Sequence, residues 1–312
     1  MNYSNFITAD SNYQHINMDN ISPAPDTLKL QIEVDALKAG NVILKTYPYV
    51  LLVCELNGNP ALRQELGRQR EMTFRNAGES TGMSLDIDRY DDYYSQLIIW
   101  DESTDRLVGG YRFGPGDKIY QHYGREGFYI HSFFDIDPAF DQYLPYCLEL
   151  GRSFVVRDYQ KKNLPLYLLW KGILAYQITH PRYKYLIGPV SISRYYSDFS
   201  RKVLMEYAKR HLLHPAFSKW FHPRTPYDPF ISKNGMGKMS EGSIQYDFEN
   251  ILDEIRPEHI QFPILMKQYI RQNARFLGFN LDPGFNDALD GLMILDIADV
   301  PVSTIELLQR EM

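Results

Sequence analysis

The stretch CLELGRSFVVRDYQ, residues 147–160, sets an acidic and a basic side chain inside a run that otherwise resembles a buried strand. Glu149 and Arg152 stand three residues apart, and Ser153 follows directly. Taking a charged group out of water costs free energy unless the group is paired, so buried strands seldom carry two of them. A fold that contains this strand must either pair the two charges with other groups or place them at a functional site.

Helical and strand-like patterns both occur along the rest of the chain. Helical patterns cover residues 26–40, 59–78, 164–180, 197–213 and 264–279. Strand-like patterns cover residues 41–56, 94–101, 106–114, 183–192 and 290–300. Asp26 and Asn59 can cap the first two helices, and Gly40 and Gly78 stand past their ends. The segment ESTD should join the second and third strand-like runs as a hairpin, and residues 115–142 and 215–250 are expected to be irregular or loop-like.

The helix over 197–213 shows an amphipathic pattern. Phe199, Val203 and Tyr207 recur at helical spacing and are expected to share its apolar face. The helix over 164–180 is apolar nearly all round, so it should be buried. Lys171 interrupts its apolar run, which also falls short of the roughly 20 residues that a membrane span needs.

The chain shows no internal repeat and no low-complexity linker in its 312 residues. Residues 1–26 are rich in Asn, Asp, Ser and Pro and are expected to form a flexible N-terminal arm. Residues 27–312 are then predicted to form a single elaborated domain, although length alone would suggest about two.

Composition excludes several classes of function. The formal net charge of -6 argues against a general nucleic-acid binder, which needs a basic face. Two cysteines, Cys54 and Cys147, cannot supply a disulfide framework or a thiolate zinc site. The N-terminal sequence lacks the features of a secretory signal. We therefore expect a protein of the reducing cytoplasm.

Motifs for phosphate loops, calcium and hydrolase nucleophiles all fail at required positions. NGMGKMS has Met239 after Lys238, DIDRYD has Asp91 where an EF-hand needs glycine, and Ser153 lies in GRSF rather than Gly-x-Ser-x-Gly. His211, His214 and His222 lack a carboxylate at metal spacing. No metal and no bound cofactor is expected.

Four short motifs remain: RQREMTF, DIDRYD, GGYRF and ELGRSF. The residues of interest in them are Arg70, Phe74, Asp88, Asp91, Arg112, Glu149, Arg152 and Ser153. Each charged residue among them, taken alone, is more often a member of a structural ion pair, because such networks mimic active sites. Their order along the chain is the stronger signal.

In that order the motifs resemble the long-chain N-acyltransferases of the GNAT superfamily, a group often labelled hemolysin-like that makes ornithine- and glycine-lipid precursors. They resemble the acyl-homoserine-lactone synthases more distantly. The resemblance runs from about Leu62 to Ser193, and ELGRSFV followed by LLWKGI is its most specific part. It implies a mixed α/β GNAT fold with a central twisted mixed sheet flanked by helices. It also implies that an acyl chain moves from a thioester to an amine.

The segment RDYQKKNLP departs from the pattern of GNAT enzymes that use acetyl coenzyme A, which carry a glycine-rich loop for the pyrophosphate at this place. Acyl carrier protein presents one phosphate on its pantetheine arm and needs less of a cradle. Lys161 and Lys162 can meet that phosphate or the acidic surface of the carrier, or they are a solvated turn. We expect acyl carrier protein as the donor partner.

The resemblance and the chemistry together predict roles for the site residues. Glu149 can take the proton of the attacking amine, directly or through water. Backbone N–H groups where neighbouring strands splay can hold the thioester oxygen. Arg70, Arg112 or Arg152 can bind the carboxylate of an amino acid, with Asp88 and Asp91 orienting them. Arg152 and Ser153 are predicted to be catalytic with Glu149, and Phe74 is predicted to bind substrate.

The resulting prediction is an amino acid N-acyltransferase that moves a long, 3-hydroxyacyl chain to glycine or ornithine in aminolipid synthesis. One alternative is a signal synthase of the acyl-homoserine-lactone type, which would use S-adenosylmethionine. Another is a non-catalytic acyl-carrier or lipid-binding protein on a GNAT scaffold. Peripheral membrane contact is compatible with all three, whereas no amphipathic basic helix supports direct membrane lysis.

Overall fold

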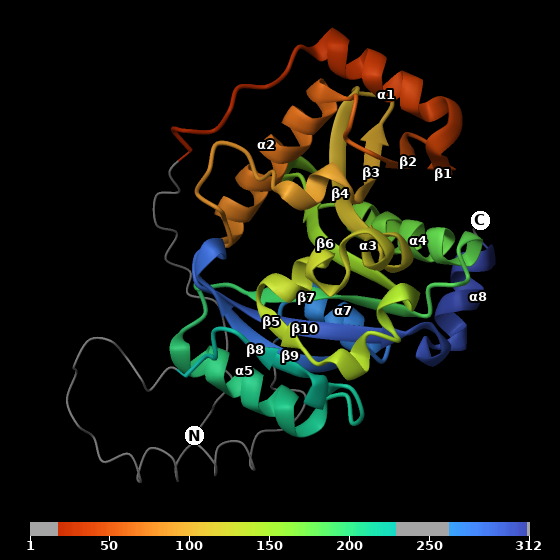
Figure 1. Ribbon diagram of the computed structural model, residues 1–312. Helices are drawn as coiled ribbons and strands as arrows, with labels where there is room; N and C mark the ends of the chain where they lie inside the picture. The colour runs from red at the N-terminus through yellow and green to blue at the C-terminus, as the bar shows by residue number, and fades with distance from the viewer. Residues whose placement is uncertain (1–17, 229–261, 311–312) are drawn as a thin grey trace.

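The computed structural model describes residues 18–228 and 262–310. Eight strands form one sheet in the order β1-β2-β3-β4-β6-β7-β10-β9 (Figure 1). Their bounds are β1 Val42–Thr46, β2 Tyr49–Cys54, β3 Ser95–Asp101, β4 Arg106–Pro115, β6 Cys147–Val155, β7 Tyr185–Ile192, β9 Arg275–Asp282 and β10 Ala288–Asp296. Neighbouring strands run antiparallel except β6 and β7, which run parallel. Two short strands, β5 Phe134–Ile136 and β8 Phe221–Pro223, pair separately.

Helices cover both faces of this sheet. They are α1 Thr27–Asn41, α2 Pro60–Ala77, α3 Gly116–Tyr123, α4 Asn163–Thr179, α5 Asp198–His211, α7 Ile264–Arg271 and α8 Val302–Arg310. Residues alternate between the faces along β3, because successive strand side chains point to opposite sides. Gln96 meets Arg70 of α2, whereas Leu97 packs beside Gly172 of α4. The sequence prediction of a mixed α/β fold with a flanked central sheet is confirmed.

The start of α2 shows how neighbouring elements complete one another. Pro60 occupies the first turn, as predicted, and Gly78 ends the helix with a φ of 74°. Asn59 takes the N-cap position but its amide donates to the carbonyl of Glu55. The carboxylate of Glu33 on α1 instead accepts from the N–H groups of Ala61 and Leu62. A residue of another helix thus satisfies the exposed N–H groups that a helix start leaves.

Most predicted elements are confirmed, including the cap at Asp26 and the hairpin of β3 and β4. Gly40 lies inside α1, which ends at Asn41. The predicted helix over 264–279 is wrong in its second half: α7 ends at Arg271, and Asn273 turns the chain with a φ of 70° into β9. The aromatic residues of β9 pack into the sheet, and this tertiary contact overrides the helical pattern.

Two further expectations need correction. Phe199 is 39% exposed and so does not belong to the buried face of α5. Val203 is buried as expected, with Leu204 and Ala208 beside it, and Tyr207 packs partly buried against the core. The segment 115–142, expected to be irregular, contains α3, β5 and several 3₁₀ turns, including η4 Tyr129–Ser132. Of the loop predicted over 215–250, residues 229–250 lie outside the described residues.

The predicted N-terminal arm also lies partly outside them, as far as residue 17. Ser22 within the described part donates its N–H to the carbonyl of Ser84. The division into an arm and a single domain stays a prediction. Across residues 18–228 and 262–310, no helix is both long enough and apolar enough to cross a membrane.

Candidate active site

Glu149 lies on β6 at the last residue pair before β6 and β7 separate. The two strands pair over only three positions, which end at Glu149 and Ile187. The carboxylate is buried and accepts from the hydroxyl of Tyr94 at 2.5 Å, the N–H of Tyr129 at 3.1 Å and the N–H of Ile130 at 2.8 Å. Burial raises the pKa of Glu149 to about 7, and these hydrogen bonds oppose the rise.

A β-bulge brings Arg152 to the same side of β6 as Glu149. In a regular strand, residues three apart point to opposite faces. The register between β4 and β6 shifts here, and Arg152 has a φ of 50°, in the left-handed region. Its guanidinium donates to the hydroxyl of Tyr129 at 2.8 Å, while the N–H of the same tyrosine donates to Glu149. The two charges therefore meet around Tyr129 without contacting each other directly.

The predicted arginines and aspartates form one connected network. Arg70 pairs with Asp91 at 2.8 Å, and Arg112 pairs with Asp88 at 2.6 Å. Burial would raise the pKa of Asp91, but the positive charges of Arg70 and Arg112 outweigh it and hold that pKa well below its usual range. The expectation that Asp88 and Asp91 orient arginines agrees with these contacts.

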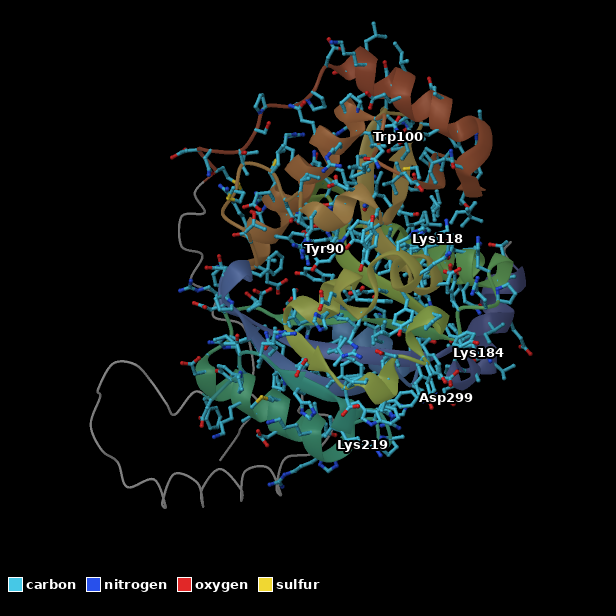
Figure 2. The ribbon with its side chains drawn as sticks, viewed as in Figure 1. Tyr90, Trp100, Lys118, Lys184, Lys219 and Asp299 are labelled. Atoms are coloured by element: carbon cyan, nitrogen blue, oxygen red, sulfur yellow. The ribbon has the colours of Figure 1, made fainter. Side chains whose placement is uncertain are left out.

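This network also holds the bulge in place. Asp88 and Asp91 cap the 3₁₀ turn η2 Arg89–Asp92 in a reciprocal capping box. Arg152 pairs with Asp86 at 2.9 Å and with Asp88 at 3.5 Å. Tyr90, on η2, is labelled near the centre of Figure 2. The guanidinium of Arg112 lies 5.4 Å from the centre of its ring. The loop 86–92 thus links α2, β4 and β6.

The arginines differ in their access to open space. Arg70 and Arg112 are 0% and 1% exposed and point into the aspartate network. The side chain of Arg152 is 10% exposed and lines a cavity. Arg152 is therefore the best placed of the three to meet a carboxylate from outside. Phe74 lines the same cavity and packs edge-on against Phe285.

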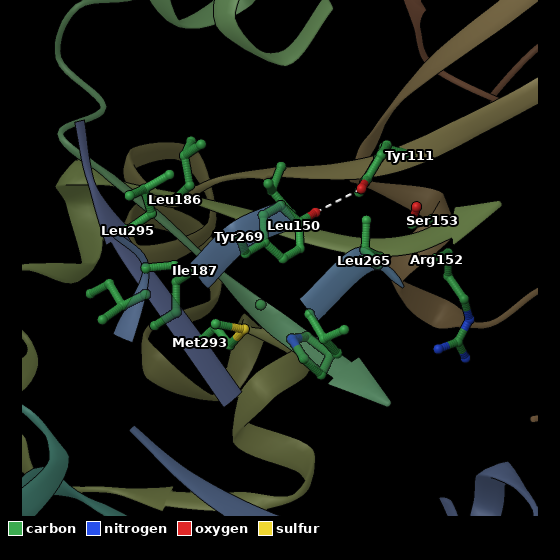
Figure 3. A pocket seen from close by; sticks show the side chains of 16 residues that line it. Tyr111, Leu150, Arg152, Ser153, Leu186, Ile187, Leu265, Tyr269, Met293 and Leu295 are labelled. Atoms are coloured by element: carbon green, nitrogen blue, oxygen red, sulfur yellow. Dashed lines mark hydrogen bonds between the residues drawn. The ribbon is translucent and has the colours of Figure 1, made fainter. Parts of the chain in front are cut away.

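A cavity lies where β6 and β7 separate, and two further cavities share lining residues with it. We call the first the strand cleft, because residues 150–153 of β6 and 186–190 of β7 form its walls. Figure 3 shows Arg152 and Ser153 at one end of it and Leu186 and Leu295 at the other. The hydroxyls of Tyr111 and Tyr269 meet across it at 2.6 Å.

The second cavity, which we call the apolar cavity, adjoins the cleft at Tyr111 and Tyr269 and measures about 400 Å³. Its other lining residues are Gln160, Lys162, Leu166, Tyr167, Trp170, Ile264, Leu265, Gln268 and Gln272. Trp170 Nε1 and Gln272 Oε1 are buried and have no hydrogen-bond partner among the described residues. Lys161 and Lys162 are exposed, and only Lys162 reaches this cavity.

The third cavity, which we call the acidic cavity, adjoins the cleft at Arg152 and Ser153 and measures about 170 Å³. Glu79 and Asp290 line it with Arg152. Burial raises the pKa of Asp290 to about 7, and the nearby charge of Asp282 adds to the rise. Burial raises the pKa of Glu79 to about 8, with a contribution from the charge of Asp290.

Comparison with known proteins matches residues 69–170 to the model of the acetyltransferase (GNAT) domain. The chain carries a GNAT acyltransferase domain. It is 28% identical over 264 residues to a glycine N(alpha)-acyltransferase of Phocaeicola vulgatus, covering 80% of each chain. It is 29% identical over 260 residues to the enzyme of the same name from Bacteroides thetaiotaomicron, covering 77% of this chain and 75% of that one.

Two solved structures show a weaker likeness. One is a coenzyme-A-dependent acyl-homoserine lactone synthase, BjaI, with a TM-score of 0.35 and 13% identity over 73% of this chain and 68% of that one. The other is the synthase LasI, with a TM-score of 0.33 and 18% identity over 46% of this chain and 72% of that one.

The GNAT resemblance inferred from the motifs is thereby confirmed, and the acyltransferase is an enzyme, so the non-catalytic alternative is not kept. All the motif residues from Arg70 to Ser153 fall inside the matched domain. The individual roles predicted for them stay predictions. Across the described ranges, no group of three or more His, Cys, Asp or Glu side chains is placed to hold a metal ion.

Sequence reasoning missed Glu79 and Asp290 as members of the site. Asp290 stands in the apolar run ALDGLMIL, as Glu149 stands in CLELGRSFV, so the same signal of a charge in a buried strand was available. Glu79 gave no such signal, because it follows Gly78 in a segment without a strand or helix pattern. Only the packing of the end of α2 against β7 and β10 brings it to Asp290.

Proposed function

We propose that the acyltransferase moves a long, 3-hydroxyacyl chain from the thioester of acyl carrier protein to the amino group of glycine. The observation that carries this proposal is the pair of unlike cavities on the two sides of the strand cleft. One is large and mostly apolar, which suits a pantetheine arm and an acyl chain. The other is small and charged, which suits a zwitterion.

The donor side is supported by three features. Among the described residues, Trp170 Nε1 has no acceptor and Gln272 Oε1 has no donor, and the two together fit an amide of the pantetheine arm. Lys162 lines the same cavity, where its ammonium group can pair with the phosphate of that arm. The segment between β6 and α4 has no glycine, which favours acyl carrier protein over coenzyme A as the donor.

The acceptor side is supported by Arg152 and by the size of the acidic cavity. A guanidinium can bind a carboxylate through two parallel hydrogen bonds. The two curated relatives are named for glycine, the smallest amino acid, and a cavity of about 170 Å³ matches a small acceptor. Ornithine stays the second choice, since its longer side chain needs more room.

The reaction needs no covalent enzyme intermediate. The amine nitrogen attacks the thioester carbon, the C–S bond breaks and the amide bond forms. Two protons leave the ammonium nitrogen, and one of them ends on the thiol that departs. Backbone N–H groups along the cleft are proposed to hold the oxygen as it becomes negative.

Glu149 is the proton acceptor predicted from the sequence, and its pKa of about 7 suits a base at neutral pH, but its carboxylate oxygens already accept three hydrogen bonds. Its hydrogen bonds support a second role, in which it fixes Tyr129 beside Arg152. A place in aminolipid synthesis, a cytoplasmic location and contact with a membrane surface also stay predictions.

The test is an assay with purified protein and defined substrates. Long-chain 3-hydroxyacyl carrier protein and acetyl coenzyme A are each offered with glycine, ornithine or S-adenosylmethionine, and products are identified by mass spectrometry. We expect N-(3-hydroxyacyl)glycine from the carrier-bound donor and little acetylglycine. Efficient acetyl transfer from coenzyme A would overturn the donor assignment, and a lactone product would favour the signal-synthase alternative.

A further inference from the structure

The acidic cavity contains two carboxylates that no part of the predicted mechanism uses. Asp290 is 3% exposed and lies on β10, paired in register with Ser191 of β7. Its Oδ1 accepts from the hydroxyl of Ser191 at 2.6 Å. Placing a carboxylate in the centre of a sheet costs free energy, so a single neutral partner is a poor structural reason for keeping it there.

Glu79 is held beside it by contacts that fix the backbone rather than the carboxylate. The N–H of Glu79 donates to the carbonyl of Phe74 at the end of α2. Asn286 donates to the carbonyl of Gly78, and Ser193 donates to that of Ala77. The end of α2 is thereby tied to the residue that follows β7 and to the turn before β10. The Glu79 side chain is left to line the cavity with Asp290 and Arg152.

This arrangement complements an amino acid at both ends. An α-amino acid carries a positive ammonium group and a negative carboxylate a few bonds apart. Arg152 lines the cavity with a permanent positive charge, and Glu79 and Asp290 line it with carboxyl groups whose ionised form a bound ammonium group would favour. Opposite charges on a ligand and its site favour binding in one orientation.

We propose that Glu79 and Asp290 form the binding site for the ammonium group of the acceptor amino acid, and that Asp290 takes its proton. The inference rests on the proposed function and deepens it. Asp290 Oδ2 receives one proton from the bound ammonium, and the freed nitrogen attacks the thioester carbon at the strand cleft. The nitrogen loses its second proton as the C–S bond breaks, and the thiolate receives it.

Several charged and titratable groups act on these carboxylates. The charge of Asp282 of β9 raises the pKa of Asp290, whereas the charge of Arg152 of β6 lowers it. The charge of Asp290 in turn raises the pKa of Tyr129 of η4. Glu79 faces Asp290 and Tyr196. The balance leaves the pKa of Asp290 at about 7, where a base is half ionised at the pH of the cell.

The experiment compares two nucleophiles with one donor. Glycine is mostly protonated at neutral pH and needs both a site for its ammonium group and a base, whereas hydroxylamine is unprotonated and needs neither. Asp290→Asn is expected to lower kcat/KM for glycine by about 100- to 10,000-fold, the usual range for loss of a general base. Transfer to hydroxylamine from the same acyl carrier protein should be retained. Glu79→Gln should raise the KM for glycine.

Asp282→Asn is the matched control, since Asp282 lies near Asp290 but does not line the acidic cavity. Its turnover of glycine should persist, with the acidic limb of the pH profile moved to lower pH, because a charge that raises the pKa of Asp290 is gone.

Two results would overturn the proposal: glycine transfer that survives Asp290→Asn with an unchanged pH profile, or an equal loss for glycine and hydroxylamine. If the wild-type enzyme rejects glycine but accepts another amino acid, the acceptor in the proposed function is wrong. The two carboxylates are then tested with that amino acid.

Discussion

Glu149 and Asp290 are two carboxylates in apolar strands of one sheet, and burial raises the pKa of each to about 7. They differ in what surrounds the oxygen atoms. Glu149 accepts from one hydroxyl and two backbone N–H groups. Asp290 accepts from one serine and faces a cavity that contains Arg152. Both carboxylates therefore have a raised pKa, so the pKa alone does not distinguish a catalytic carboxylate from a structural one. The distinguishing property is whether the carboxylate can contact a ligand in a cavity.

The largest expected difference is in turnover. Asp290→Asn should reduce kcat with glycine by about 100- to 10,000-fold, whereas Glu149→Gln should leave activity per folded molecule within about tenfold of the wild type. Glutamine turns an amide N–H₂ toward groups that are themselves donors, so Glu149→Gln should lower the free energy of unfolding by about 1–3 kcal/mol.

Turnover and thermal stability measured on one preparation of each variant check this difference. If Glu149→Gln lost more than about 100-fold in kcat with an unchanged melting temperature, the role of base would return to Glu149.

Arg152 belongs to both regions, because it contacts Tyr129 beside Glu149 and lines the acidic cavity with Asp290. Arg152→Lys keeps the charge beside Asp86 but loses the planar fork that grips a carboxylate. We expect the KM for glycine to rise about 10- to 100-fold, from the loss of about 1.5–3 kcal/mol of charge-assisted hydrogen bonding. Glycinamide, which lacks the carboxylate, serves as the control acceptor and should show little change. An equal loss with both acceptors would place Arg152 in the structure rather than in recognition.

The pH dependence of stability gives a third test. Asp290 ionises near pH 3.9 in the unfolded chain and near 7 in the folded one. The folded protein favours the neutral Asp290 carboxyl, so the contribution of this group to the free energy of unfolding is greatest below about pH 3.9. That contribution is lost as the pH rises through about 7. Asp290→Asn removes the buried charge, so it should raise the free energy of unfolding at pH 8 by about 1–3 kcal/mol and change it little at pH 4. Urea unfolding at the two pH values measures this, and a variant less stable at pH 8 would contradict it.

The smallest expected effect lies on the donor side, away from both carboxylates. Reversing Lys161 and Lys162 to Glu should raise the KM for acyl carrier protein roughly three- to tenfold at low salt, since exposed charges contribute little each. It should also weaken the salt dependence of that KM, because screening acts over about 8 Å at physiological salt. The KM for glycine and the pH profile should not move. Unchanged kinetics with the carrier at low salt would place its docking surface elsewhere.

Much of the fold follows from local patterns. The N-cap of α1, the end of α2 at Gly78, the β3–β4 hairpin and the buried α4 each depend on residues close in the chain. The second half of the predicted helix over 264–279 was wrong because contacts with β10 and the two-stranded sheet decide that segment. The buried face of α5 was misjudged for a related reason, since neighbouring strands select which of its apolar residues they cover.

For the site, the sequence by itself determined which residue types are available: the motifs place the arginines, aspartates and Glu149 inside the stretch that matches the GNAT domain. Only the tertiary structure decided how they face one another. The bulge at Arg152 turns that side chain toward Tyr129, and it persists because Asp86 and Asp88 hold the guanidinium. Asp290 and Glu79, 211 positions apart in number, share a cavity only after β10 pairs with β7 and α2 docks on the sheet. A left-handed backbone conformation costs strain energy, and a contact between residues distant in sequence costs chain entropy. Both are offset only by tertiary contacts, so no local sequence pattern predicts them.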